Sequence, residues 1–305
     1  MKSKSYSGVI IPSVTPLTRD FKLDHASVEK ILDLFREQEV TPFILGTTGE
    51  AASLPFTLKK DFLQLAGKLK KSGDLLYAGV SANVFSESVE LSQLAFDGGV
   101  DVVVATLPSY YSLTETAMLR YFEQLADAVK RPMMIYNIPA TTHMSVPVHV
   151  IDKLSHHPNI VGVKDSERSE NRLSESIALW RDRDDFSYLL GWAARSAQAL
   201  LQGADGLVPS TGNFDPGLYS ELFRQARQGS EEEALHLQLL SDELGGLYQQ
   251  NRTLGESLWA LKVVMNEAGL CGTTVMPPLC SLSEDEERRL RKDFQNIIQQ
   301  RNKIA

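Results

Sequence analysis

A lysine stands directly after an apolar run in the stretch "NIVGVKDSER", residues 159–168. The run predicts a buried strand, and burial of an ammonium group is costly unless the group is paired or loses its proton. A desolvated lysine can attack a ketone as the neutral amine, and the resulting Schiff base accepts electrons when a carbon–carbon bond of the substrate breaks. A lone lysine at a strand end is more often a side chain that reaches for solvent. The groups around Lys164 therefore decide its interpretation.

Hydroxyl side chains follow other apolar runs of the chain. Tyr136 ends the run "PMMIY" and carries a phenol of the kind that a proton shuttle requires. Thr47 and Thr48 lie in "GTTGE", residues 46–50, where the N–H groups of a glycine-bounded turn could hold a carboxylate or phosphate. The same motif is equally typical of a tight turn before a helix. Further residues directly after apolar runs are Thr15, Ser81, Asn83, Tyr110, Tyr111, Asn137, Asp165, Gly191, Trp192, Ser210 and Thr211.

Histidines and clustered carboxylates do not collect at these positions. The residues His143, His149, His156 and His157 fall in predicted loops or helices, which disfavours a metal-dependent enzyme. The serines that follow apolar runs have no histidine or aspartate placed to activate them, which disfavours a serine nucleophile. The pattern thus predicts that the protein uses no metal and that Lys164 acts among hydroxyl groups.

Eight short apolar runs alternate with amphipathic stretches between residues 8 and 228. The stretches carry apolar residues at helical spacing, as in Val28, Ile31, Leu32 and Phe35. Strands joined by helices are parallel, and eight such units favour a (β/α)8 barrel, the TIM barrel, over an open doubly wound sheet, for which the glycine-rich turn is missing. A parallel barrel gathers the residues that follow its strands at one mouth. Helix N-caps are predicted at Asp24, Thr57 and Thr114, and Pro147 suits a first helical turn.

The remainder of the chain shows no strand pattern. It predicts helices near residues 230–250, 256–269 and 284–302, the last opened by a capping box from Ser283 to Glu286. We expect this helical appendage to pack beside the barrel. The predicted division is a catalytic barrel over residues 1–228 and a three-helix region over residues 229–305.

Composition excludes several classes of partner. The chain has 305 residues, a net charge of −8 and a pI near 5.4, so it lacks the basic surface expected of a protein that binds nucleic acid or an anionic membrane. The apolar part of "MKSKSYSGVIIPSVTP" is cut by Pro12, which argues against a signal peptide. Cys271 and Cys280 lack metal-site spacing and are expected to be buried free thiols of a cytoplasmic protein.

Four motifs resemble those of one known family, the Schiff-base pyruvate lyases of the dihydrodipicolinate synthase and N-acetylneuraminate lyase type. They occur in order as "GTTGEAASL" (46–54), "YNIPATT" (136–142), "VGVKDS" (161–166) and "GLVPSTGN" (206–213). The resemblance covers about residues 6–280. It implies a barrel with C-terminal helices, a homotetramer built as a dimer of dimers, and no cofactor beyond the imine of the substrate.

The resemblance also implies roles for individual residues. Lys164 resembles the Schiff-base lysine, and Tyr136 resembles the acid/base that moves protons at the reacting atoms. Thr47 and Thr48 resemble the turn that holds the pyruvate carboxylate, with Thr47 relaying protons to Tyr136. Tyr111 resembles a tyrosine that completes this relay from across a dimer interface, with Tyr110 as the alternative one position earlier. Gly191 and Val208 resemble the strand-end positions that line the rest of the pocket in this family.

Two positions depart from the best-known members of the family. Dihydrodipicolinate synthases carry a carboxylate-binding arginine where this chain has Thr141, and threonine cannot replace the bidentate contact. Neuraminate lyases carry acidic residues where this chain has Trp192, Ala193 and Ala194. We therefore expect a lyase that cleaves a 2-keto-3-deoxy acid to pyruvate and an aldehyde. The alternatives are dihydrodipicolinate synthesis from pyruvate and aspartate semialdehyde, a keto-acid dehydratase, or a sensor that binds a keto acid without turnover.

Overall fold

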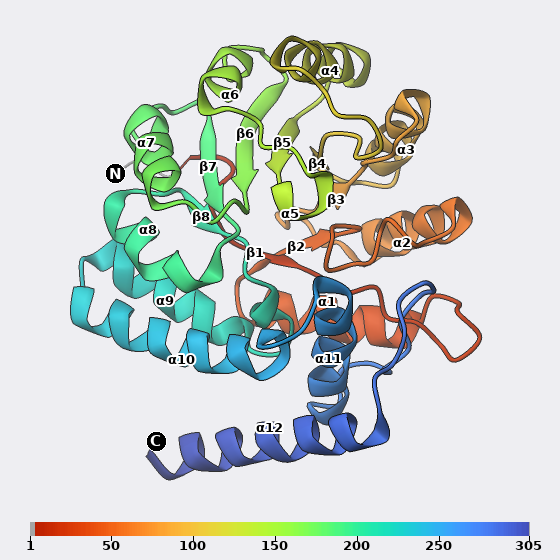
Figure 1. The fold of residues 1–305 in the computed structure, drawn as a ribbon, viewed down its shortest axis with the longest axis vertical. Coiled ribbons are helices and arrows are strands. Elements are labelled where there is room, and N and C mark those ends of the chain that lie inside the picture. The colour runs from red at the N-terminus through yellow and green to blue at the C-terminus, as the bar shows by residue number, and fades with distance from the viewer. Residues whose placement is uncertain (1–3, 305) are drawn as a thin grey trace.

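The strands form a closed parallel barrel in the order β1 to β8, as the sequence predicts. The computed structural model describes residues 4–304, with side chains described as far as Arg301. Figure 1 shows the strands at the centre of a ring of helices. The strands are β1 (Gly8–Pro12), β2 (Thr41–Ile44), β3 (Tyr77–Gly79), β4 (Val102–Ala105), β5 (Met133–Asn137), β6 (Ile160–Asp165), β7 (Ser187–Leu190) and β8 (Gly206–Leu207).

Helices follow the strands and cover the outside of the barrel. They are α1 (His25–Glu37), α2 (Phe56–Leu69), α3 (Phe85–Asp97), α4 (Glu115–Val129), α5 (Pro139–Thr142), α6 (Val148–Leu154), α7 (Glu170–Trp180), α8 (Ser196–Gln202) and α9 (Pro216–Gln228). Single turns of 3-10 helix, η1 (Ala193–Arg195) and η2 (Ser210–Asn213), follow the last two strands. The chain ends in α10 (Glu231–Gln249), α11 (Leu254–Glu267) and α12 (Glu284–Ile304), of which α12 runs along the lower edge in Figure 1.

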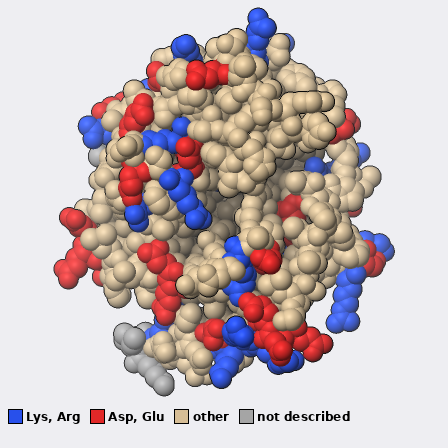
Figure 2. Space-filling model, viewed as in Figure 1, with Lys and Arg blue, Asp and Glu red and all other residues tan. Residues whose placement is uncertain are grey.

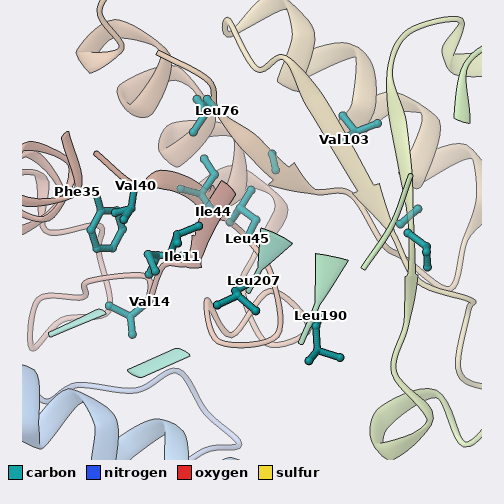
Figure 3. Packing of buried hydrophobic residues seen from close by; sticks show 14 of the residues in the cluster. Ile11, Val14, Phe35, Val40, Ile44, Leu45, Leu76, Val103, Leu190 and Leu207 are labelled. Carbon is teal, nitrogen blue, oxygen red and sulfur yellow. The ribbon is translucent and has the colours of Figure 1, made fainter. Parts of the chain in front are cut away.

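Alternation along the strands divides the buried apolar residues into two layers. Ile10 of β1 faces the barrel interior, whereas Ile11 packs outward among helix side chains that include Phe35 (Figure 3). The inner layer consists of Ile10, Phe43, Tyr77, Val102, Val104, Met134, Tyr136, Ile138, Leu189 and Val208. The interior is therefore a packed core, and only its end can form a site.

The predicted helix starts are partly confirmed. The side chains of Asp24 and Thr114 cap α1 and α4 by accepting hydrogen bonds from backbone N–H groups. Thr57 is not an N-cap, because Pro55 precedes the helix and α2 already begins at Phe56. Ser283 accepts a hydrogen bond from the Glu286 N–H, but the Glu286 carboxylate is paired with Arg252 instead of turning back to complete a capping box.

The two cysteines are both free, but they differ in their surroundings. Cys271 is buried, whereas Cys280 is exposed, so the expectation of two buried thiols is wrong for Cys280. Cys280 lies in the irregular segment between α11 and α12, where no apolar layer covers it. In the part of the chain that the structure describes, no helix is long and apolar enough to span a membrane.

Candidate active site

Lys164 and Tyr136 are neighbours at the carboxyl ends of two adjacent strands. The register of β5 and β6 pairs Tyr136 with Lys164, and both side chains face the barrel interior. Lys164 Nζ lies 3.9 Å from the centroid of the Tyr136 ring and 4.9 Å from that of Phe43. Only 4% of Lys164 is exposed, and 5% of Tyr136. The amine thus lies between two aromatic rings at the inner end of the barrel mouth.

Burial lowers the pKa of Lys164 below its ordinary value, and the nearby Tyr136 opposes this shift only in part. Among the side chains described, from residue 4 to residue 301, no carboxylate forms an ion pair with Lys164 that would keep the ammonium charged. The neutral amine is the nucleophilic form of lysine. The environment of Lys164 therefore favours attack on a carbonyl group over a structural ion pair.

The turn with the sequence GTTGE meets Tyr136 from the end of β2. Thr47 Oγ1 lies 3.3 Å from the Tyr136 hydroxyl, within hydrogen-bond distance. The turn is closed by hydrogen bonds from Gly49 N–H to Gly46 C=O (3.1 Å) and from Glu50 N–H to Thr47 C=O (3.0 Å). Thr48 is buried in the same turn. The structure thus brings together four of the residues singled out from the sequence.

Close backbone packing allows this turn to reach the barrel. Gly79 of β3 lies so near the turn that a Cβ atom there would be 2.0 Å from the Leu45 carbonyl oxygen. Leu45 and Glu50 have φ values of 55° and 58°, in the left-handed region that non-glycine residues rarely adopt. Strained conformations of this kind persist only where the surrounding structure enforces them, and they cluster at functional sites.

A cavity of about 500 Å³ opens beside the turn and Tyr136. Its inner wall includes Phe43, Thr47, Tyr136 and Thr141, and its outer part extends to residues of α2, α3 and α11. The face seen in Figure 2 is hollowed near its centre. A cavity of this size accommodates a small organic acid with its polar contacts.

Two pocket residues predicted after the last strands have different surroundings. Val208 is buried in the barrel interior with Tyr136. Gly191 donates its N–H to the Asp165 carbonyl at 2.7 Å, and a Cβ atom there would lie 2.1 Å from Ser166 Oγ. The absence of a side chain at Gly191 therefore lets the turn after β7 pass close to that after β6.

Trp192 is half-buried beside the barrel mouth. The Arg195 guanidinium stacks 4.9 Å from the centroid of its ring and forms an ion pair with Glu170. Arg195 is thus held at the surface by its contacts with Trp192 and Glu170.

Tyr111 is not part of the cavity in a single chain. Tyr110 and Tyr111 are 77% and 73% exposed, and their rings contact each other edge to face with centroids 4.9 Å apart. Two exposed aromatic side chains in one loop are unusual for a soluble surface unless another molecule covers them.

A buried polar cluster that the sequence did not reveal supports β5 and β6 from outside. Asp165, which points away from the barrel interior, accepts hydrogen bonds from Asn137 Nδ2 (2.9 Å) and Arg172 Nε (2.6 Å). Asn137 also accepts from the Val146 N–H at 3.0 Å. An arginine in the amphipathic pattern of α7 carries no sequence signal for burial, so only the structure shows this contact.

Comparison with known proteins agrees with this geometry. The model of the "Dihydrodipicolinate synthetase family" matches residues 5–297. A 4-hydroxy-tetrahydrodipicolinate synthase of Alkalilimnicola ehrlichii is 28% identical over 94% of this chain and 97% of its own length. The putative 2-dehydro-3-deoxy-D-gluconate aldolase YagE of Escherichia coli K12 is 28% identical over 97% of this chain and 98% of its own.

The solved structure of YagE in complex with pyruvate superposes with a TM-score of 0.90 over 96% of this chain and 98% of that one, at 28% identity. The match in sequence and in fold spans the whole barrel and the helices after it. This chain belongs to the dihydrodipicolinate synthetase family, and it is a carbon–carbon lyase of the class I pyruvate aldolase type.

Proposed function

We propose that the protein is a Schiff-base lyase that cleaves a 2-keto-3-deoxy acid to pyruvate and an aldehyde. The observation that carries the proposal is the buried, uncompensated amine of Lys164 against the ring of Tyr136. The Tyr136 hydroxyl in turn lies next to Thr47. A nucleophilic amine, a proton-transfer group and an anion-binding turn are the three parts that this reaction needs.

The chemical steps follow from these roles. The neutral amine of Lys164 attacks the C2 ketone of the substrate, and the ketone oxygen leaves as water with one proton from the amine and one from the Tyr136 hydroxyl, which gives an iminium ion and a phenolate. Tyr136 takes the proton of the C4 hydroxyl as the C3–C4 bond breaks, and the electron pair of that bond moves to the iminium to form an enamine. The aldehyde leaves, the enamine is protonated at C3, and water hydrolyses the imine to release pyruvate and the amine.

The turn of residues 46–50 is the proposed site for the C1 carboxylate. Thr47 and Thr48 would donate hydrogen bonds to the carboxylate from hydroxyl and backbone groups, which fixes the C2 carbon against Lys164. Thr47 would also relay protons through its contact with Tyr136. We further propose that Gly191 and Val208 line the rest of the pocket.

The outer part of the cavity favours a substrate with an uncharged distal end. Thr141 lines the cavity where an arginine would be needed to grip a second carboxylate. Beside the barrel mouth, and outside the residues that line this cavity, Trp192 presents apolar area and Arg195 is neutralised by Glu170. The lysine at the outer end of the cavity, Lys59, interacts electrostatically with Glu87. YagE, named for a 2-dehydro-3-deoxy acid, supports this substrate class.

The name of the Alkalilimnicola relative supports a second candidate, condensation of pyruvate with aspartate semialdehyde. Incubation with a panel of 2-keto-3-deoxy acids, with released pyruvate as the readout, separates the two. Pyruvate release from an acid with an uncharged end supports the lyase. Efficient condensation without such release would replace it by the synthase, and pyruvate binding without either reaction would indicate a sensor.

The assembly that we propose is a homotetramer built as a dimer of dimers. Its tight dimer would cover Tyr110 and Tyr111 and bring Tyr111 to the relay of the neighbouring chain. The exposed side chains of Val84 and Phe85, at the start of α3, add apolar area for such a contact. We further propose that residues 1–228 act as the catalytic barrel with residues 229–305 as its helical support, in the cytoplasm.

A further inference from the structure

The turn that carries Thr47 and Thr48 ends in a fully buried ion pair. Lys262 Nζ of α11 lies 2.5 Å from Glu50 Oε1, and neither side chain has any exposed area. The other carboxylate oxygen, Glu50 Oε2, accepts a hydrogen bond from the Met276 N–H at 2.6 Å. Lys262 also donates to the Thr274 carbonyl at 2.7 Å. One side chain of the barrel turn is thus fastened to two separate parts of the C-terminal region.

Stability alone does not explain this pair. Two charges buried together are often no more stabilising than apolar side chains of similar volume, because desolvation offsets their attraction. The neighbours of Lys262 on α11 are apolar and buried, including Leu261 and Val263, so an apolar residue would suit the same position. What an ion pair adds is a defined direction and distance for the groups that it joins.

Backbone hydrogen bonds couple the position of Glu50 to that of Thr47. Glu50 N–H donates to the Thr47 carbonyl at 3.0 Å, and Ala51 N–H donates to the Gly46 carbonyl at 3.3 Å. Thr15 holds the other side of the turn by donating its hydroxyl to the Gly49 carbonyl at 2.6 Å. A shift of Glu50 therefore moves Thr47, whose hydroxyl lies 3.3 Å from that of Tyr136. Because the Glu50 carboxylate is paired away from solvent, it acts through the turn and not on the substrate.

We propose that Glu50 and Lys262 are positioning residues that hold the turn of residues 46–50 in its carboxylate-binding conformation. The inference rests on the proposed function, since it assumes that this turn binds the carboxylate of the keto acid. It assigns to α11 a role in substrate binding, although Lys262 lies 212 positions from Glu50 along the chain. The two residues set the affinity for the keto acid, while Lys164 remains the group that reacts.

The test compares Glu50→Gln with the double variant Glu50→Gln/Lys262→Met. Each protein is incubated with increasing pyruvate, and borohydride then reduces the imine to a stable adduct. We measure the pyruvate concentration that gives half of the maximal adduct, and separately the melting temperature. Glu50→Gln should raise the half-maximal concentration about tenfold, because small misplacement of a positioning group is costly, and should lower the melting temperature by leaving Lys262 unpaired. In the double variant the melting temperature should recover, whereas the half-maximal concentration should stay raised.

Asp205→Asn is the matched control, since Asp205 forms a buried ion pair with Lys4 at the opposite end of the barrel, 2.8 Å long. It should lower the melting temperature without changing the half-maximal concentration. An unchanged half-maximal concentration in the double variant, or an equal rise in Asp205→Asn, overturns the positioning role. Absence of adduct in the wild-type protein overturns the proposed function, and this inference with it. Trapping that is normal in the wild type and in Glu50→Gln overturns the inference alone.

Discussion

Tyr136 and Lys164 occupy paired positions on β5 and β6, with the lysine nitrogen 3.9 Å from the centroid of the tyrosine ring. Paired residues of neighbouring parallel strands point to the same side of the sheet, here into the barrel. The pairing therefore sets the orientation of the amine against the phenol before any substrate binds. It also excludes a carboxylate from the position beside the amine, which favours the neutral form of Lys164.

Replacement of Tyr136 by phenylalanine tests the proton-transfer role. The ring and its packing remain, but the hydroxyl that contacts Thr47 is lost. We expect turnover to fall on the order of 10²-fold, as for loss of a general acid/base. Steady-state kinetics on a cleavable 2-keto-3-deoxy acid would measure the change, and normal turnover in Tyr136→Phe would remove the residue from its proposed role.

The lowered pKa of Lys164 predicts a pH-dependent penalty to stability. The unfolded chain keeps this lysine protonated up to its ordinary pKa of 10.5, whereas the folded protein releases the proton at lower pH. The unfolded state thus binds more protons in this window, so the contribution of Lys164 to stability rises with pH. Lys164→Met should therefore stabilise the protein most below the window, and this gain should shrink as the pH rises through it. Thermal melts of the two proteins across the range would show a constant difference if the pKa were not lowered.

Complementation between two inactive variants tests the proposed contribution of Tyr111. Each chain in a mixed dimer of Lys164→Ala and Tyr111→Phe lacks one residue, but one of the two sites would contain both native residues. Mixing the variants after dissociation should restore activity well above that of either alone. Tyr110→Phe is the matched control and should be near wild type. Failure to complement, or full activity in a stable monomer, would assign Tyr111 to the surface.

The replacement at Thr141 predicts substrate preference. A missing charge-assisted contact costs about 1.5–3 kcal/mol, so the protein should favour a 2-keto-3-deoxy acid with an uncharged end over aspartate semialdehyde by about ten- to a hundredfold in kcat/KM. Thr141→Arg should reduce this preference, and Thr141→Gln, which adds length without charge, is the control. Side-by-side kinetics that show efficient condensation by the wild-type protein would reverse the assignment.

The sequence predicted the barrel because each strand and helix has a strong local pattern. Eight apolar runs appear as the eight strands, and the groups after them converge, so Lys164, Tyr136 and Thr47 could be placed together before any coordinates. The ends of the helices were less predictable. Threonine is a common N-cap residue, but α2 begins at Phe56, so Pro55 and not Thr57 occupies the N-cap position.

Contacts between distant segments were not predictable. Lys262, the buried partner of Glu50, lies 212 positions further along the chain. A single lysine within the apolar stretch "WALKVV" does not indicate which acidic residue it pairs with. The role that we propose for Tyr111 involves a second chain, and local patterns carry no information about contacts between chains. Local periodicity thus determines the elements, whereas the pairing of buried charges depends on tertiary packing.

Borohydride trapping with pyruvate tests whether Lys164 is the residue that forms the imine. Reduction of the imine should leave a stable adduct, and mass spectrometry of the digested protein should place it on the peptide that contains Lys164. We expect this adduct in the wild-type protein and, at a slower rate, in Tyr136→Phe, and we expect its loss in Lys164→Ala. No adduct in the wild type, or an equal amount in Lys164→Ala, would show that Lys164 does not form the imine.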